Sequence, residues 1–350
     1  MTLLVRWGKG VEILTLKIAS MAFRLINRLF SFSICIALIL TSCSHSVERK
    51  KSEFIETKPL KAEMVSLHEI ISPDFMTLKG NNLIISSSRS KPTMLFAYST
   101  PSLEFKADFG TKGQGPEEIK LFPMFCESPA SSDLHVWGYS PVTIKRISIS
   151  ENGKIEYKGD IILKSYETFN DMSIIGDSTF VFYLPDKLTV KKVDLIKNNE
   201  STITLSKDDH REGFFYSNRG NIVTSESMLV YSYLFKKQID IYDLLTLKLK
   251  TTISDGKKYP KPIPIDFESL TFHYVRIYAG EKYFYALYNG IKKTTSVEPS
   301  RFLEVFDYEG NPIVKYSFDI PPFLFVVDEK NGKIYGFNEN YEDYLLRYSL

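Results

Sequence analysis

The stretch Ile239-Asp240-Ile241-Tyr242-Asp243 is one copy of a short pattern that recurs six times along the chain. Each copy has an apolar residue, two intervening residues, a second apolar or aromatic residue, and then Asp or Ser. The other copies are Leu95-Phe96-Ala97-Tyr98-Ser99, Ile144-Lys145-Arg146-Ile147-Ser148, Val190-Lys191-Lys192-Val193-Asp194, Leu303-Glu304-Val305-Phe306-Asp307 and Leu345-Leu346-Arg347-Tyr348-Ser349. They follow one another at intervals of about 50 residues, which is typical of a repeat architecture.

Each repeat unit also contains other strand-like runs separated by turn-forming residues. A strand-like run such as Leu83-Ile84-Ile85 precedes each copy, and a turn such as Gly80-Asn81-Asn82 separates it from a still earlier run. After the copy come another turn, such as Glu309-Gly310-Asn311-Pro312, and a fourth run. Four short antiparallel strands per unit, with no helical period, predict an all-β fold. We therefore expect a six-bladed β-propeller with four antiparallel strands per blade.

The last unit is incomplete, because the chain stops at Leu350 after the third strand of that unit. We expect the N-terminal segment from Lys61 to Ile70 to supply the missing outer strand. The ring would then be closed by the N-terminal strand, and the propeller would span residues 61–350.

The first 42 residues are typical of a lipoprotein signal peptide. Arg24 and Arg28 precede an apolar run, Leu29 to Leu40, which is too short to span a bilayer and suits a signal sequence. The segment Leu40-Thr41-Ser42-Cys43 resembles the lipobox of bacterial lipoproteins. That resemblance implies that Cys43 is lipidated and becomes the new N-terminus. A plain secretory signal with an incidental cysteine is the alternative.

Residues 43–60 are polar and rich in lysine, so we expect a flexible tether between the lipid and the propeller. The start of the chain stays open between Met1 and Met21, because Met21 would begin a signal of ordinary length. The residues after Cys43 lack the acidic cluster that resembles a surface-export signal in Bacteroidetes lipoproteins. A periplasm-facing anchor is therefore favoured over a surface-exposed one.

Charge and cysteine content exclude several classes of protein. The whole chain has a net charge of +2, and its first 42 residues hold an excess of basic residues, so the remainder is slightly acidic. A nucleic-acid-binding domain would be strongly basic, so no nucleic-acid partner is expected. Of the three cysteines, Cys35 leaves with the signal and Cys43 would carry the lipid. The remaining Cys126 cannot form an intramolecular disulfide and is predicted to be a buried, inert thiol.

The loops of the predicted propeller are distributed unequally between its two faces. Antiparallel order places the turns between first and second strands, and between third and fourth strands, on one face, and these turns are mostly short. The other face carries the loops between second and third strands and the connections between blades. Its long segments are Gly110–Phe122, Lys164–Asn170, Lys207–Gly220, Asp255–Leu270 and Asn289–Arg301. Because long loops on a rigid scaffold often bind ligands, we expect the functional surface there.

The most distinctive of these loops is Phe109-Gly110-Thr111-Lys112-Gly113-Gln114-Gly115-Pro116-Glu117-Glu118-Ile119. Its glycines and proline specify a defined backbone path, and we expect Gln114, Glu117 and Glu118 to bind a ligand at the rim of the central channel. The loop lacks the spacing of a phosphate-binding loop. It resembles the G-x-G-Q-G-P-x-E motif of Bacteroidetes six-bladed propeller lipoproteins, which are described as TolB-like or NHL-like. The resemblance spans most of residues 43–350 and implies the fold and an envelope location, but no particular activity. The alternative is that the glycines only shape the ring.

A second group of candidate ligand-binding residues lies at the starts of the innermost strands, which line the channel of a propeller. These residues are Asp74, Asn170, Asp171, Asn221 and His273. Oxygen ligands of this kind could hold Ca²⁺, although polar residues also line wet channels without any metal. We expect no metal or other cofactor, and no motif of a hydrolytic triad or a zinc protease is present.

The sequence favours a binding or scaffold lipoprotein that is anchored through the lipid on Cys43 alone. Such a monomeric protein would present its loop-rich face to an envelope protein, a peptide or a glycan. The alternative is a metal-dependent propeller hydrolase or lyase, similar to a lactonase, that uses the central channel.

Overall fold

The computed structural model describes residues 47–70, 72–90, 92–115, 117–120, 122–129, 131–138, 142–163, 171–176, 178–205, 218–259, 271–292 and 301–350. The predicted signal segment and Cys43 therefore lie outside the described residues. Within these residues, no helix is long and apolar enough to cross a membrane.

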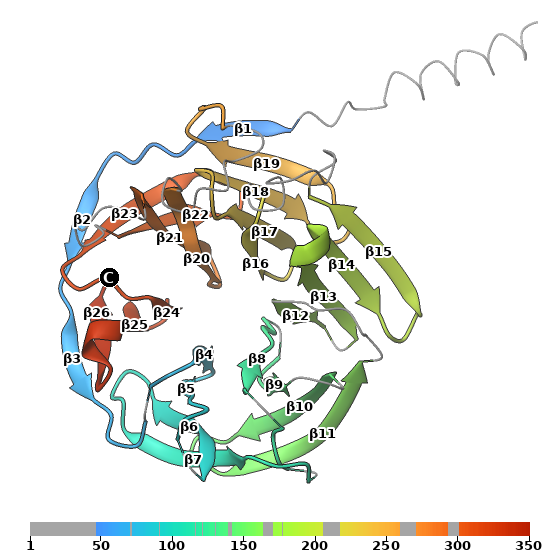
Figure 1. The fold of residues 1–350 in the computed structure, drawn as a ribbon, viewed down its shortest axis with the longest axis vertical. Coiled ribbons are helices and arrows are strands. Elements are labelled where there is room, and N and C mark those ends of the chain that lie inside the picture. The colour runs from blue at the N-terminus through green and yellow to red at the C-terminus, as the bar shows by residue number, and fades with distance from the viewer. Residues whose placement is uncertain are drawn as a thin grey trace, which may run out of the picture. The chain divides into compact units, whose positions relative to one another are not determined.

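Six sheets, each with four antiparallel strands, form a ring around a central axis, which confirms the predicted six-bladed propeller (Figure 1). Blade one contains β4 (Phe75–Lys79), β5 (Asn82–Ser86), β6 (Thr93–Ser99) and β7 (Phe105–Thr111). Blade two contains β8 (Met124–Phe125), β9 (Leu134–Gly138), β10 (Val142–Ile149) and β11 (Ile155–Leu163). Blade three contains β12 (Met172–Ile175), β13 (Thr179–Leu184), β14 (Thr189–Asp194) and β15 (Asn199–Thr204).

The other three blades each include a strand from the N-terminal segment. Blade four contains β16 (Gly220–Thr224), β17 (Met228–Tyr233), β18 (Gln238–Asp243), β19 (Leu249–Ser254) and β1 (Glu48–Lys51). Blade five contains β20 (Thr271–Ala279), β21 (Tyr283–Lys292), β22 (Phe302–Asp307), β23 (Pro312–Phe318) and β2 (Thr57–Leu60). Blade six contains β24 (Leu324–Asp328), β25 (Lys333–Phe337), β26 (Tyr344–Ser349) and β3 (Glu63–Ser66).

All six copies of the recurring pattern lie in the third strands of the blades, and their residues have two structural roles. The apolar positions pack into the core, as in blade four, where Ile239 and Ile241 are completely buried. The final Asp or Ser fixes the next turn in several blades. Asp243 Oδ1 accepts a hydrogen bond from the backbone N–H of Thr246, and Asp307 Oδ1 accepts one from that of Asn311. Asp and Ser favour such turns because their short side chains reach the nearby backbone.

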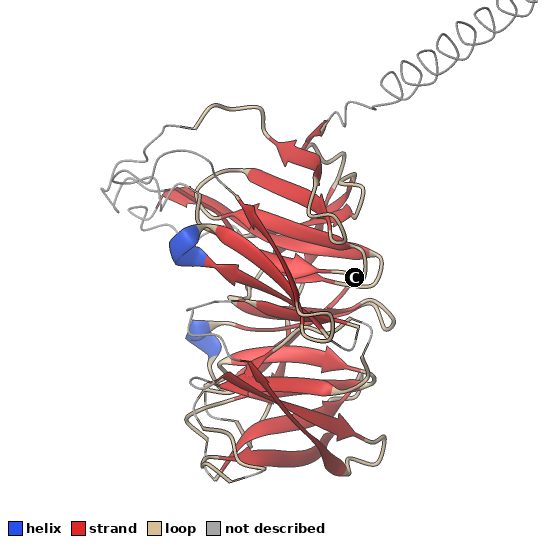
Figure 2. Ribbon diagram, turned by 90° about the vertical axis from the view of Figure 1, so that its right-hand side faces the viewer, coloured by secondary structure: helices blue, strands red, loops and turns tan. Residues whose placement is uncertain are grey.

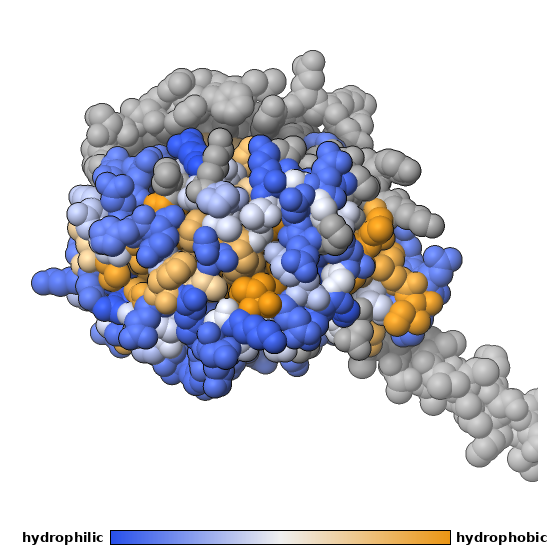
Figure 3. Space-filling view, turned by 90° about the horizontal axis from the view of Figure 1, so that it is seen from below, coloured by the Kyte–Doolittle hydropathy of each residue, from blue (hydrophilic) through white to orange (hydrophobic). Residues whose placement is uncertain are grey.

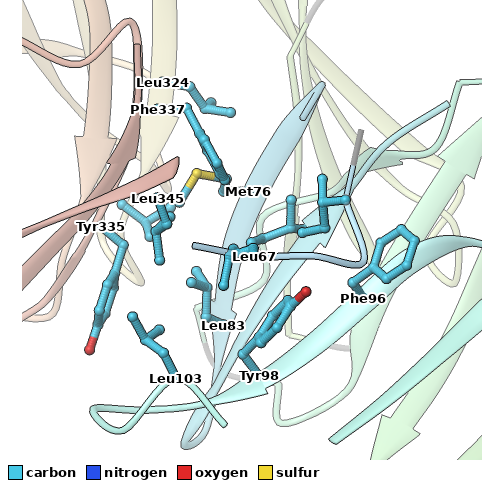
Figure 4. Close-up of a cluster of buried hydrophobic side chains, with 13 residues drawn as sticks. Leu67, Met76, Leu83, Phe96, Tyr98, Leu103, Leu324, Tyr335, Phe337 and Leu345 are labelled. Carbon is cyan, nitrogen blue, oxygen red and sulfur yellow. The ribbon is translucent and has the colours of Figure 1, made fainter. Parts of the chain in front are cut away.

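The ring closes as the sequence predicts, through the N-terminal strand β3. This strand pairs antiparallel with β26, with Val65 opposite Leu345. Next to the joint, Leu67 packs into a cluster that also holds Met76 of blade one and Phe337 of blade six (Figure 4). The closing strand therefore joins the first and last blades through both backbone pairing and a shared apolar core.

The prediction of a flexible tether is wrong for residues 48–60. Strand β1 pairs parallel with β19 of blade four, and β2 pairs parallel with β23 of blade five (Figure 1). Between them, the ring of Phe54 packs edge-on against Phe306, with the ring centroids 5.2 Å apart. Residues 48–60 thus form a belt along the outer edge of two blades, because the edge strands of those blades offer free backbone groups.

Leu60 anchors the end of this belt, so its truncation tests whether the belt contributes to stability. Leu60 is 4% exposed and packs against the core of blades five and six. We expect Leu60→Ala to lower the free energy of unfolding by about 2–4 kcal/mol, because a buried side chain is lost and a cavity remains. Ile55→Ala is the matched control, since Ile55 is fully exposed in the same segment. Equal urea midpoints for the two variants would show that the belt is not bound in solution.

The long segments Lys164–Asn170, Lys207–Gly220, Asp255–Leu270 and Asn289–Arg301 lie wholly or mostly outside the described residues, so the unequal distribution of long loops stays a prediction. Short 3₁₀ helices η1 (Pro185–Lys187) and η3 (Glu339–Tyr341) occupy loops between second and third strands, and both lie on the same side of the ring (Figure 2). On the opposite face, only the turn between β8 and β9 is long among those between first and second strands. Cys126 lies in that turn and is buried, and burial raises the pKa of its thiol well above the ordinary value. The prediction of an inert thiol agrees with this environment.

Candidate functional site

The glycine-rich loop between β7 and β8 folds back on itself. Gly110 at its start has φ +72°, a conformation that favours glycine. Farther along, Gly113 N donates to Ile119 O at 3.1 Å and Ile119 N donates to Thr111 O at 2.9 Å. The side chain of Ile119 is buried beneath the loop. The backbone path that the sequence predicted is therefore closed by hydrogen bonds within the loop.

Glu118 holds the tip of this loop. The backbone N–H of Gly115 donates to Glu118 Oε2 at 2.7 Å. A Cβ atom at Gly113 would lie 1.9 Å from the same oxygen, so the glycine leaves room for the carboxylate. Glu118 is thus a positioning residue for the loop, whereas Gln114 and Glu117 are exposed.

The loop forms one wall of a pocket of about 380 Å³, here called the glycine-loop pocket. The other walls are the second, third and fourth strands of blade two. The lining residues are Gln114, Gly115, Glu118, Ile119, Lys120, Val136, Gly138, Thr143, Lys145, Asp160 and Ile162. Lys145 and Asp160 form an ion pair with 3.2 Å between Nζ and Oδ2, and Ile162 exposes 64% of its surface to solvent. The pocket therefore combines a charged pair, amide and hydroxyl groups, and an aliphatic surface.

The placement of this loop differs from the expectation that it borders the channel. Its pocket extends over the outer strands β10 and β11, away from the centre of the ring (Figure 1). The loop follows the outermost strand of blade one, and its internal hydrogen bonds keep it near that strand. Gln114 and Glu118 line this pocket and not the channel cavity described below, and Glu117 lines neither of the two.

A second cavity, of about 190 Å³, lies in the central channel and is here called the channel cavity. It contains two of the predicted residues, Asp171 and Asn221. The lining residues are Phe75, Met76, Met124, Phe125, Glu127, Trp137, Asp171, Met172, Ser173, Asn221, Ile222, Val223, Val275, Arg276 and Ile277. These residues lie in or next to five of the six innermost strands, namely β4, β8, β12, β16 and β20.

The other predicted channel residues do not line this cavity. Asp74 accepts a hydrogen bond from the backbone N–H of Ser88 at 2.5 Å, which fixes a loop in blade one. His273 packs against Tyr259 and Tyr288 between blades four and five, and burial lowers its pKa to about 4. Asn170 lies outside the described residues.

Sequence reasoning missed two charged residues of the channel cavity, Glu127 and Arg276. Burial raises the pKa of Glu127 and lowers that of Arg276, while the charge of Asp171 opposes the second shift. Burial also raises the pKa of Asp171 to about 6, against a hydrogen bond from Ile222 N and the charge of Arg276. The sequence feature that could have predicted this site is the presence of an arginine within an apolar inner strand, because a buried charge is costly without a function or a partner.

The family model of TolB-like six-blade propeller-like proteins matches residues 52–330. The chain belongs to the TolB-like six-bladed propeller family. An exported protein from Bacteroides fragilis is similar in structure, with 11% identity and a TM-score of 0.55, over 87% of this chain and 99% of that one. A member of the DUF4221 family from Bacteroides vulgatus has 12% identity and a TM-score of 0.55, over 82% and 97%. No curated protein matches the sequence.

The described part of this TolB-like propeller contains no group of three or more His, Cys, Asp or Glu side chains that could hold a metal ion. Asp171 and Glu127 line the channel cavity together with Arg276, but the charge that acts on Arg276 is that of Asp171, whereas the charge that acts on Glu127 is that of Lys79. The Ca²⁺ site that the sequence left open therefore stays a prediction, and no set of ligand residues is assigned to it.

The raised pKa of Asp171 predicts how the stability of the TolB-like propeller changes with pH. Its folded pKa of about 6 exceeds the ordinary value of 3.8, so the charged carboxylate opposes folding. The loss of folding free energy that results from ionising Asp171 develops as the pH rises from about 4 to 6 and is complete at neutral pH. We expect Asp171→Asn to raise the free energy of unfolding by roughly 1–2 kcal/mol at pH 7 and to leave it unchanged near pH 4. Urea unfolding at both pH values measures this difference, and an equal effect at both would contradict the assignment.

Proposed function

We propose that this protein is a lipid-anchored binding or scaffold protein of the cell envelope, and that it captures its partner at the glycine-loop pocket. One observation carries the proposal: the most distinctive loop of the loop-rich face builds a pocket of about 380 Å³ together with blade two. That volume is within the usual range of about 300–1,000 Å³ for ligand sites. The anchor follows from the signal segment and Cys43, by their resemblance to bacterial lipoproteins.

The chemistry of the pocket favours a peptide segment of an envelope protein as the partner. Lys145 and Asp160 offer one cationic and one anionic group, and Gln114 offers an amide. Ile162 adds an exposed aliphatic surface next to them. Alternating charged and apolar groups on an extended peptide would match this lining, and a glycan is the alternative partner.

Among the described residues, the edge of the ring that Figure 3 shows is not a broad apolar patch. Viewed from below, one edge of the ring is mainly hydrophilic, with small apolar patches between the polar residues (Figure 3). Small patches of this kind are ordinary on soluble proteins. The proposal therefore depends on the glycine-loop pocket and on the few charged and polar groups that line it.

Charge reversal at Lys145 tests the proposal. We expect Lys145→Glu to weaken partner binding at least about tenfold, because it removes one of the two lysines that line the pocket and places a carboxylate that repels Asp160. Lys191→Glu is a matched control, since Lys191 has the same position in blade three and pairs with Glu200 at 3.0 Å. Binding is measured on peptide and glycan arrays with the full-length protein, and unfolding curves confirm that both variants fold. Equal loss of binding in both variants, or in neither, would refute the pocket as the site.

A further inference from the structure

The channel cavity differs from the glycine-loop pocket in size and in lining. Its volume of about 190 Å³ is below the range of about 300–1,000 Å³ for drug-sized ligands, so it suits a small molecule. Ten of its fifteen lining residues are apolar, among them Met76, Met124 and Met172, while polar atoms make up the larger part of the surface inside it. Such flexible, polarisable side chains adapt to varied apolar groups.

Arg276 is the one positively charged residue among those that line this cavity. Among the described residues, none forms an ion pair with its guanidinium within 4.0 Å, and the charge of Asp171 raises its pKa against the effect of burial. The pairing of β20 with β21 is irregular just before it, since Tyr274 pairs with Tyr288 and Arg276 with the adjacent Leu287. Val275 is therefore the extra residue of a β-bulge. Such bulges redirect side chains and occur next to functional sites.

Two carboxylates face the same cavity from other blades, and the backbone holds both in place. Asp171 Oδ2 accepts a hydrogen bond from Ile222 N at 3.3 Å. At Glu127, the backbone N–H donates to Met172 O at 3.1 Å, and the carbonyl accepts from Ile174 N at 2.7 Å. The cavity is thus lined by one arginine and two acidic residues from three different blades, and the charge of Lys79 also acts on Glu127.

We propose that the channel cavity binds a free α-amino acid with an apolar side chain. Arg276 would bind the carboxylate of the ligand through its planar fork of N–H donors, which suits carboxylates. Asp171 and Glu127 would accept hydrogen bonds from the α-ammonium group, and the methionines would surround the side chain. A zwitterion satisfies both kinds of charge at once, whereas a simple acid or amine would leave one kind unpaired in a buried site.

The experiment titrates the full-length protein with L-leucine, L-methionine and L-phenylalanine by isothermal calorimetry at pH 7.5. We expect at least one of them to bind, and its N-acetyl and amide derivatives to bind at least about tenfold more weakly. Arg276→Gln and Asp171→Asn should each weaken binding at least about tenfold. Arg146→Gln is the control and should not change binding, because Arg146 is exposed on blade two. No binding of the three amino acids, or equal binding of the derivatives, would overturn the proposal.

The pH dependence of binding gives a second test that needs no variant. The groups next to Asp171 are Arg276, Glu127, the phenol of Tyr183 and the backbone N–H of Ile222. Because the pKa of Asp171 is about 6, lowering the pH from 7.5 to 5 should protonate it and weaken binding about tenfold. Affinity that stays constant over this interval would count against an ammonium group beside Asp171.

Discussion

Removal of residues 1–70 is expected to prevent the formation of a monomeric ring. Strand β3 would be lost, so β26 would become an unpaired edge next to blade one. The buried side chains of Leu60, Leu67 and Ile70 would also be lost. Each large-to-small truncation in a core costs about 2–5 kcal/mol, and a whole domain is stable by only about 5–15 kcal/mol. Size-exclusion chromatography should therefore show aggregated protein, since exposed edges pair with other chains.

A shorter truncation separates the closing strand from the belt. Removal of residues 1–60 keeps β3 and eliminates only β1 and β2, which add to sheets that already have four strands. That chain should remain a folded monomer of reduced stability. If the chain without residues 1–70 were equally monomeric and equally stable, the ring would not depend on the N-terminal closure.

Lys237→Met is expected to have the largest effect of any single substitution considered. Glu304 of β22 is completely buried, and its Oε1 lies 3.2 Å from Lys237 Nζ of blade four. Tyr274 donates to its other carboxylate oxygen at 2.9 Å, and Lys315 Nζ lies 4.0 Å from Oε1. Without Lys237, the buried carboxylate would keep only the more distant cation. We expect a loss of about 3–5 kcal/mol in the free energy of unfolding, measured by urea denaturation.

A second substitution shows whether this loss comes from the uncompensated charge. The double variant Lys237→Met, Glu304→Leu removes both members of the pair and should recover a large part of the lost stability. Replacement of a buried ion pair by apolar side chains is often neutral or stabilising. A double variant that is no more stable than Lys237→Met alone would instead assign the loss to the packing of the lysine stem.

The blades could be predicted because their signals are local, and the closure because the last repeat unit lacks a fourth strand. The apolar positions of each third strand and the Asp or Ser after them act within a few residues, so the pattern repeats whenever the structure repeats. The belt carries no such signal. Its strands Glu48–Lys51 and Thr57–Leu60 are mostly polar and exposed, and they are held by parallel backbone pairing. Backbone hydrogen bonds to an edge strand far away in the sequence do not require particular side chains, so the amino-acid composition hardly reveals them.

The candidate site was predictable only in part, for a related reason. The glycine-rich loop and the channel position of Asp171 follow from chain order, and both lie in cavities. The location of the loop over blade two depends on Glu118 and Ile119 packing under its own backbone, which is a tertiary contact. Arg276 follows a β-bulge in β20. A bulge inserts one residue and so shifts the alternation of side chains between the two faces of a strand, from which the channel-facing residues are predicted.

The central claim is that the loop-rich face captures a partner at the glycine-loop pocket. A photo-crosslinking amino acid at position 162, in cells that make the full-length protein, tests it most directly, because Ile162 is an exposed residue of that pocket. Position 245 is the control, since Leu245 is 82% exposed in a turn of the opposite face. We expect a crosslinked partner from position 162 that disappears with Lys145→Glu, and none from position 245. Crosslinking from position 245 alone would contradict it.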